Sequence, residues 1–215
     1  MIDFSSLTNF QIPEGKVTAL AINGNPVWTA EKWDIEWKYD GSRPSTSAWT
    51  YPEGTSLIKP SSSMNAVSFS APTSNDVALI ELNTTKYPAN NNCIFEIEFN
   101  IDVIGYDYPG VHFVLTGPSS SGEARALRCN AAIGTGEAIF IEGHNKTRQI
   151  SGDAWHTLRL ELNITTGKNR IYLDKVLLCE VNNSNLDYYY EGEGAHFWTR
   201  ECTCYVRALR YRKET

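Results

Sequence analysis

The chain has 215 residues, a formal net charge of −6 and only 20% charged residues. A negative net charge argues against a nucleic-acid partner. No apolar run approaches the roughly 18 residues of a membrane-spanning helix, so we expect no membrane insertion. A chain of this length buries roughly 70% of its extended surface, which is enough for a full core.

The composition predicts an all-β protein. Aromatic residues make up 12% of the chain, and Asn, Ser, Thr and Gly crowd the segments between apolar runs, which is turn chemistry repeated often. No segment longer than about 12 residues carries an apolar stripe of helical period. We therefore expect one antiparallel sandwich with very little helix.

The N-terminal segment predicts a small hairpin. Residues 10–22 lead into Asn23-Gly24, a strong signal for a tight turn, and the return ends at Trp28. The polar stretch 29–32 is a candidate linker. We therefore divide the chain into an N-terminal hairpin or attachment segment, residues 1–30, and a main domain, residues 31–215. In the alternative, the hairpin packs on the main domain and Trp28 plugs its core. The first 15 residues lack a basic start and an apolar stretch, so we expect no secretory signal.

Aromatic residues near turn signals suggest sugar binding. Flat rings stack on pyranose faces, while Asn, Asp, Arg and His hydrogen-bond to hydroxyl groups. The candidate carbohydrate-binding residues are Trp49, Tyr106, Tyr108, Arg128, His144 and Tyr190. The alternative for each aromatic residue is a packing role at an end of the sandwich.

The stretch from residue 155 to residue 178 predicts three strands. Leu158, Leu160 and Leu162 fall on one side of an extended chain and alternate with polar residues on the other. Residues 165–169 then reverse the chain, and Asp174-Lys175 reverses it again. We expect one face of these strands to be buried and the other face to be exposed to solvent.

Five cysteines follow no zinc-binding spacing. We interpret them as reduced, with Cys202 and Cys204 on one face of a strand as small hydrophobic residues. We expect neither a metal site nor a cofactor. Five basic residues gather near the C-terminus: Arg200, Arg207, Arg210, Arg212 and Lys213. We interpret Arg207 and its neighbours as outward positions on the last strand and a frayed tail, with contact to an acidic partner as the alternative.

The pattern W-H-T-L-R-L, a turn, Y-L-D-K and V-L-L in residues 155–178 resembles the laminin-G-like members of the concanavalin-A-like jelly rolls. Those proteins usually carry Gly where Lys175 stands here. Residues 94–101 resemble the family's early central strand, and residues 204–211 its closing strand. The resemblance covers residue 33 to the C-terminus. It implies a concanavalin-A-like antiparallel β-sandwich (jelly roll), here preceded by the short N-terminal β-hairpin.

The jelly-roll glucanases suggest a test for catalysis at Glu96, Glu98 and Asn100. Their motif resembles E-x-D-x-E, with the first Glu as nucleophile and the last as acid/base. Retaining glycosidases place two carboxyl groups about 5 to 5.5 Å apart, but the amide of Asn100 cannot donate the proton that the leaving group needs. We therefore expect no enzyme activity and place these side chains on the wetter face of a strand whose apolar residues fill the core.

The sequence of residues 12–28, I-P-E-G-K-V through N-G-N-P-V-W, resembles short segments of bacteriophage tail, fibre and other structural proteins. It implies attachment to a particle through other virion proteins. The resulting hypothesis is a non-enzymatic phage virion protein (fibre, decoration or tail-associated) that binds host or mucosal surface glycans. It would act in the virion, assembled in the host cytoplasm, as a homo-oligomer whose linked weak sites reinforce one another. The alternatives are an extracellular bacterial carbohydrate-binding module or glycosidase-like domain, and an architectural domain without a ligand.

Overall fold

The computed structural model describes residues 31–102, 110–118, 124–132, 138–141, 146–150, 154–189 and 194–214, together with four short strands near the N-terminus. The chain divides into two compact units, residues 1–33 and 34–215.

The N-terminal unit contains two antiparallel strand pairs. Strand β1 (Gln11–Ile12) pairs with β2 (Gly15–Lys16), and β3 (Ala19–Ile22) pairs with β4 (Asn25–Thr29). The second pair flanks Asn23-Gly24, so the predicted hairpin is confirmed. The predicted boundary after residue 30 and the role of Trp28, whose side chain lies outside the described residues, stay predictions.

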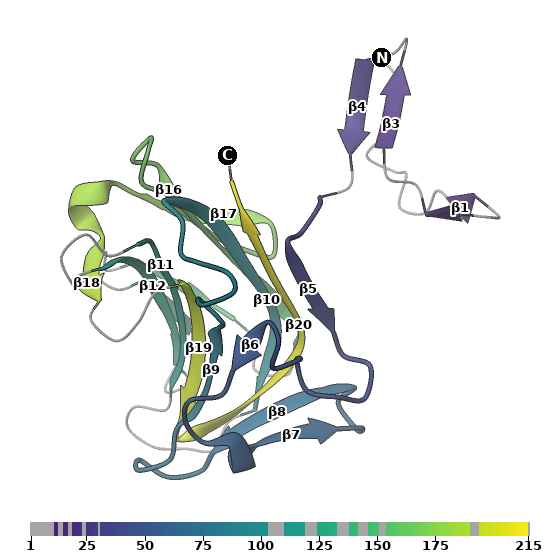
Figure 1. Ribbon diagram of the computed structural model, residues 1–215. Helices are drawn as coiled ribbons and strands as arrows, with labels where there is room; N and C mark the ends of the chain where they lie inside the picture. Colours follow the sequence, from purple (N-terminus) through teal and green to yellow (C-terminus); the bar gives the residue numbers. More distant parts are fainter. Residues whose placement is uncertain are drawn as a thin grey trace. The chain divides into compact units, whose positions relative to one another are not determined.

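The larger unit is a sandwich of two antiparallel sheets (Figure 1). From edge to edge, sheet 1 contains β17 (Val176–Val181), β16 (Asn169–Leu173), β15 (His156–Asn163), β10 (Asn92–Asp102), β20 (Cys202–Lys213), β8 (Ala66–Ala71) and β7 (Ile58–Ser61), and β5 (Ile35–Lys38) also pairs with β20. Sheet 2 contains β14 (Lys146–Gln149), β13 (Ala138–Ile141), β12 (Ala124–Ala132), β11 (Gly110–Thr116), β19 (Gly194–Arg200), β9 (Ala78–Leu82) and β6 (Trp49–Thr50), and β18 (Asp187–Tyr189) also pairs with β12. The all-β jelly-roll sandwich predicted from the sequence is confirmed.

Helical structure in the described part of the chain is limited to two short 3-10 turns, η1 (Thr55–Leu57) and η2 (Asn183–Asn185). In that same part, no helix has the length and apolar character needed to cross a membrane.

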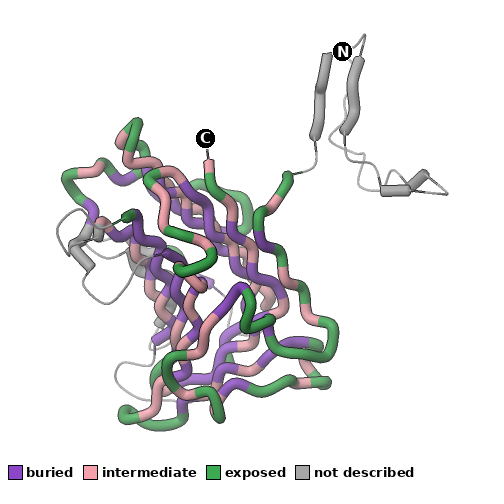
Figure 2. Tube along the Cα trace, viewed as in Figure 1, coloured by how far each residue is buried: buried purple, intermediate pink, exposed green. Residues whose placement is uncertain are grey.

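The core lies between the sheets and consists of side chains that alternate along each strand (Figure 2). Phe99 of sheet 1 contacts Phe113 of sheet 2 at a ring-centroid distance of 5.0 Å. Phe69 meets Phe197 edge to face at 4.8 Å across the same interface. These cross-sheet aromatic contacts fix how the two layers stack.

Strand β15 follows the alternation expected from its sequence. Leu158, Leu160 and Leu162 are buried, and the polar residues between them are partly exposed. The turn between β16 and β17 consists of Asp174 and Lys175, which have φ values of 50° and 67°. Asp174 Oδ1 accepts a hydrogen bond from the backbone N–H of Thr157 at 2.8 Å, which ties this turn to β15.

All five cysteines are buried with free thiols. Cys202 and Cys204 both belong to the core, as predicted. Burial in apolar surroundings raises the pKa of the Cys93 and Cys202 thiols to about 12. These thiols are therefore packing groups.

Candidate functional site

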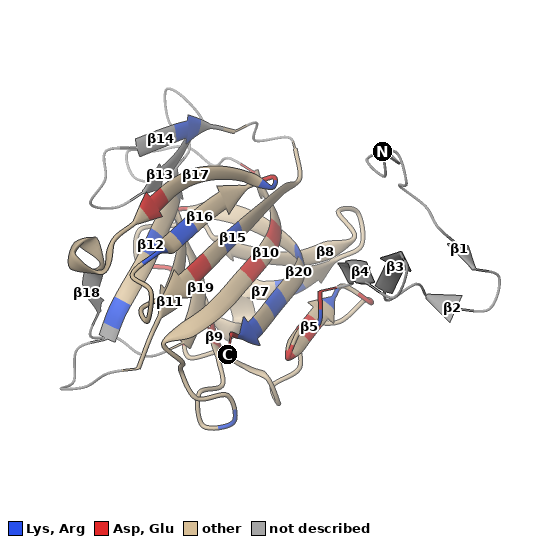
Figure 3. Cartoon of the chain, turned by 90° about the horizontal axis from the view of Figure 1, so that it is seen from above, with Lys and Arg blue, Asp and Glu red and all other residues tan. Residues whose placement is uncertain are grey.

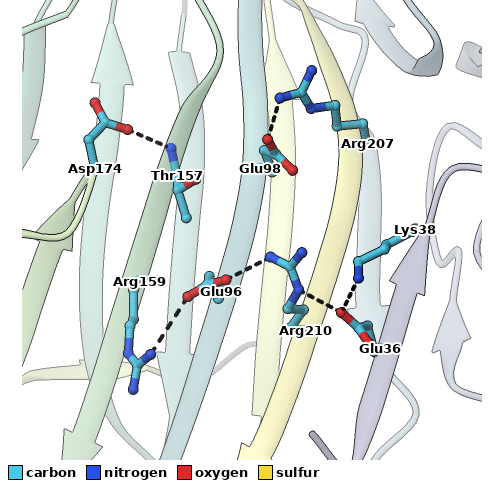
Figure 4. A network of polar contacts seen from close by, with 9 residues as sticks. All are labelled: Glu36, Lys38, Glu96, Glu98, Thr157, Arg159, Asp174, Arg207 and Arg210. Atoms are coloured by element: carbon cyan, nitrogen blue, oxygen red, sulfur yellow. Dashed lines mark hydrogen bonds and ion pairs between the residues drawn. The ribbon is translucent and has the colours of Figure 1, made fainter. Parts of the chain in front are cut away.

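The outward face of sheet 1 carries a ladder of ion pairs (Figures 3 and 4). The register of β5, β20, β10 and β15 places Glu36, Arg210, Glu96 and Arg159 in one row. Arg210 Nη1 lies 2.7 Å from Glu96 Oε1 and its Nε lies 3.0 Å from Glu36 Oε1. Arg159 Nη1 completes the row at 3.7 Å from Glu96 Oε2. Positive and negative groups alternate, so the charges of this row compensate one another.

The glycosidase-like positions lie on this face. Glu96 is held between two guanidinium groups, and Glu98 pairs with Arg207. Arg207 in turn lies over the Trp155 ring, 4.1 Å from its centroid. Asn100 was expected on the wetter side with Glu98, but it is only 4% exposed and lies opposite Tyr205 of β20. Both carboxylates are thus ion-pair partners of arginines.

Arg207, Arg210 and Arg212 lie on β20, which is a central strand of sheet 1, whereas Arg200 is the last residue of β19 in sheet 2. Arg210 pairs with two glutamates, and Arg212 Nε lies 2.5 Å from Glu214 Oε1. The strand extends to Lys213. The outward placement of the β20 arginines is confirmed, while the expected frayed tail is wrong because Arg212 and Lys213 still pair with β10.

The outward face of sheet 2 has a different chemistry. Along β11, Val111, Phe113 and Leu115 point into the core, so His112 points outward. The same alternation applied to β9, β12 and β19 defines what we call the His112–Trp198 face. Its polar and aromatic members are Glu81, His112, Arg128, Asn130, His196, Trp198 and Arg200.

Two rows of cross-strand neighbours build this face. In the first row, His112 lies opposite Asn130 on one side and opposite Trp198 on the other. The His112 and Trp198 rings are stacked, with centroids 3.6 Å apart and planes 6° apart. In the second row, Val114 separates Arg128 from His196. The sequence places these residues far apart, and pairing of β11 with β12 and β19 brings them together.

The exposed fraction of the side chains varies across the His112–Trp198 face. His196 is 2% exposed, and its Nδ1 lies 3.1 Å from Glu81 Oε1. His112, Asn130 and Trp198 are partly exposed, while Arg200 is exposed. The face therefore has a shielded part at His196 and an accessible part around the stacked rings.

His112 is uncharged at neutral pH. Burial lowers its pKa to about 4, assisted by the positive charges of Arg128 and Arg200 and opposed by a hydrogen bond with Asn130. A neutral imidazole has one N–H donor and one acceptor nitrogen. Beside it, Asn130 has an amide and Arg128 a guanidinium, so a hydroxyl-rich ligand would meet both donors and acceptors.

The structure brings one predicted site residue to this face, Arg128. Trp49 is not available for a ligand: it is 1% exposed, and its ring lies 6.1 Å from that of Phe95 in the core. A sugar cannot stack on a ring that the two sheets enclose, so its assignment as a binding residue is withdrawn. Tyr106, Tyr108, His144 and Tyr190 lie outside the described residues.

Sequence reasoning did not propose His112, Asn130 or Trp198 as site residues, and it named Arg200 only among the basic residues near the C-terminus. The available signal was the matching pattern of two strands, G-V-H-F and G-A-H-F, each with a polar residue at an outward position of an otherwise apolar segment. The pattern does not reveal that the two strands are neighbours. Within the described residues, no cluster of three or more His, Cys, Asp or Glu side chains offers a metal site.

No protein family and no curated protein matches the sequence. Solved structures do match the fold. A conserved carbohydrate esterase from the Shiga toxin-encoding bacteriophage phi24B is similar with a TM-score of 0.64 and 10% identity, over 86% of this chain and 99% of that one. The apo Crh5 transglycosylase gives a TM-score of 0.62 and 8% identity, over 84% of each chain.

The carbohydrate recognition domain of Emp46p is also similar, with a TM-score of 0.57 and 13% identity, over 86% of this chain and 100% of that one. These proteins include enzymes and a recognition domain. Identities this low show the shared β-sandwich fold, and a fold does not fix a function.

Proposed function

We propose that the protein binds surface glycans on the His112–Trp198 face. The observation that carries this proposal is the parallel stack of His112 and Trp198 beside Asn130. A partly exposed aromatic ring offers a flat apolar surface, and the adjacent polar groups offer directional hydrogen bonds, which is the combination that sugar rings require.

The scaffold favours such a site because it holds the side chains in place. The residues project from central strands of sheet 2, and the opposite sides of those strands are anchored in the core by Phe113 and Phe197. A preorganised site loses less conformational entropy on binding than one made from loops. The fold of the three similar structures, which are named for carbohydrate recognition or carbohydrate chemistry, is compatible with this proposal.

We further propose that the protein is a non-enzymatic component of a phage particle, with the N-terminal unit as the attachment segment. Two observations support this. Residues 1–33 form a compact unit of their own, and a phage protein is among the similar structures. The ion-paired state of Glu96 and Glu98 favours binding without catalysis over the glycosidase-like alternative.

Replacement of Trp198 by Ala tests the site. On a glycan array, followed by titration of the glycans bound, we expect affinity to fall about ten-fold or more because an aromatic contact is lost. Trp155→Ala is the matched control, since Trp155 is a partly exposed tryptophan that contacts Arg207 of sheet 1. Unchanged binding by the Trp198 variant, or loss confined to the Trp155 variant, would place the site elsewhere.

The particle role and the absence of catalysis need separate measurements. Mass spectrometry and immunogold labelling of purified phage particles should detect the chain on their surface. Incubation of the protein with each bound glycan should leave that glycan intact by mass. Absence of the chain from the particles would favour the bacterial glycosidase-like alternative. Glycan fragments that are formed by the parent protein and not by Glu96→Gln would also favour it.

A further inference from the structure

The two outward faces differ in charge balance, and this difference bears on the kind of glycan. On sheet 1, cations and anions alternate within bonding distance, as in Arg210 between Glu96 and Glu36. On the His112–Trp198 face, the described side chains include the cations Arg128 and Arg200. Its described acidic side chain is Glu81, which lies against His196.

The two arginines flank the stacked rings. Arg200 follows Trp198 by two residues on β19 and so lies on the same face, about 6 to 7 Å further along the strand. Arg128 precedes Asn130 by two residues on β12 and lies one row away in the opposite direction. Both guanidinium groups are close enough to lower the pKa of His112. Among the described side chains, the accessible part of the face therefore carries a positive group on each side of the rings.

Arg200 has the geometry of an anion-binding group. It is exposed, and its Nε donates a hydrogen bond to the backbone oxygen of Ser74 at 2.9 Å. That bond orients the guanidinium from the side of Nε. The N–H groups of its two Nη atoms form the fork that recognises a carboxylate or sulfate oxygen pair.

We propose that the glycan bound by this face is acidic: a sugar whose carboxylate or sulfate ester is held by Arg200 while its ring lies against Trp198. This inference rests on the proposed glycan-binding function and adds the ligand class to it. Arg128, on the other side of the rings, extends the positive surface to the next sugar of the chain.

The test is an array of matched glycan pairs: sialylated and desialylated, uronate and neutral hexose, sulfated and unsulfated. The full chain should bind the acidic member of a pair about ten-fold more tightly or better, with a preference that weakens as salt rises because salt screens exposed charges. The pairs also tell a carboxylate from a sulfate ester. Arg200→Gln should remove most of the preference by weakening binding of the acidic member.

Two further variants make the result decisive. Arg170→Gln removes an outward arginine of sheet 1 that pairs with Glu180 and should keep the preference. Arg200→Lys keeps the positive charge but lacks the two Nη groups of the guanidinium, so this variant should retain part of the preference for acidic glycans. Equal binding of acidic and neutral members, or a preference that survives Arg200→Gln, would overturn this inference alone. No binding to any glycan would overturn the proposed function and this inference with it.

Discussion

At the scale of single residues, His112 shows how burial and nearby charges determine the protonation state of a side chain. It is stacked on Trp198 and lies near two guanidinium groups. Burial and like charge both oppose a second proton on the imidazole. The ring therefore stays neutral in the folded protein at pH values where it is half protonated in an unfolded chain.

This state predicts acid sensitivity of the fold. The folded-state pKa of His112 is lowered to about 4 from 6.5, so the unfolded chain binds more protons between those values and stability falls as pH falls through that window. Between pH 7 and pH 5, the free energy of unfolding should drop by about 2 kcal/mol more in the parent than in His112→Gln. Denaturant titrations at both pH values measure this, and parallel losses in the two proteins would contradict it.

At the scale of elements, the β16–β17 hairpin shows a departure from ideal turn chemistry. Its two turn residues have positive φ, and the second is a lysine. A side chain at positive φ costs roughly 1–2 kcal/mol, which glycine avoids. Asp174 offsets part of this cost through its hydrogen bonds to Thr157 N–H and to His156 Nδ1, both at 2.8 Å.

Lys175→Gly should therefore stabilise the protein. We expect a gain of about 0.5–1 kcal/mol, since relief of strain at positive φ exceeds the added entropy of the unfolded chain. Thermal and denaturant unfolding measure the gain. Lys168→Gly is the control, because Lys168 is an exposed turn residue outside the positive-φ positions and should show no gain. A loss of stability in Lys175→Gly would show that its side chain makes contacts that outweigh the strain.

At the scale of the whole molecule, the chain combines a small N-terminal unit with a large sandwich. Sheet 1 includes the last strand of the chain between β10 and β8, while β5 pairs with the same strand. Among the described residues, the hydrophobic core of the sandwich is made from residues 35–211. We therefore expect the sandwich to be stable without the N-terminal unit.

Removal of residues 1–33 should accordingly leave a folded domain. We expect residues 34–215 to unfold cooperatively, with a melting temperature within about 3 °C of the full chain, because every described core residue lies within this fragment. The same fragment should keep glycan binding and lose association with particles. An unfolded or aggregated fragment would show that the first unit contributes to the core.

The amino-acid sequence was sufficient to predict the fold class, the alternation of β15 and the burial of Cys202 and Cys204. These features depend on local period and side-chain chemistry, which a single sequence displays. The sequence did not predict that Trp49 is buried, because the pattern of an aromatic residue between turn signals is the same for a core residue and for a ligand-binding residue. The sequence also did not predict that His112 lies beside Trp198 and near Arg128. That neighbourhood is created by the pairing of β11 with β19 and β12, strands separated by long stretches of chain. The folded structure is needed to reveal this neighbourhood, because strand order depends on the packing of the whole core.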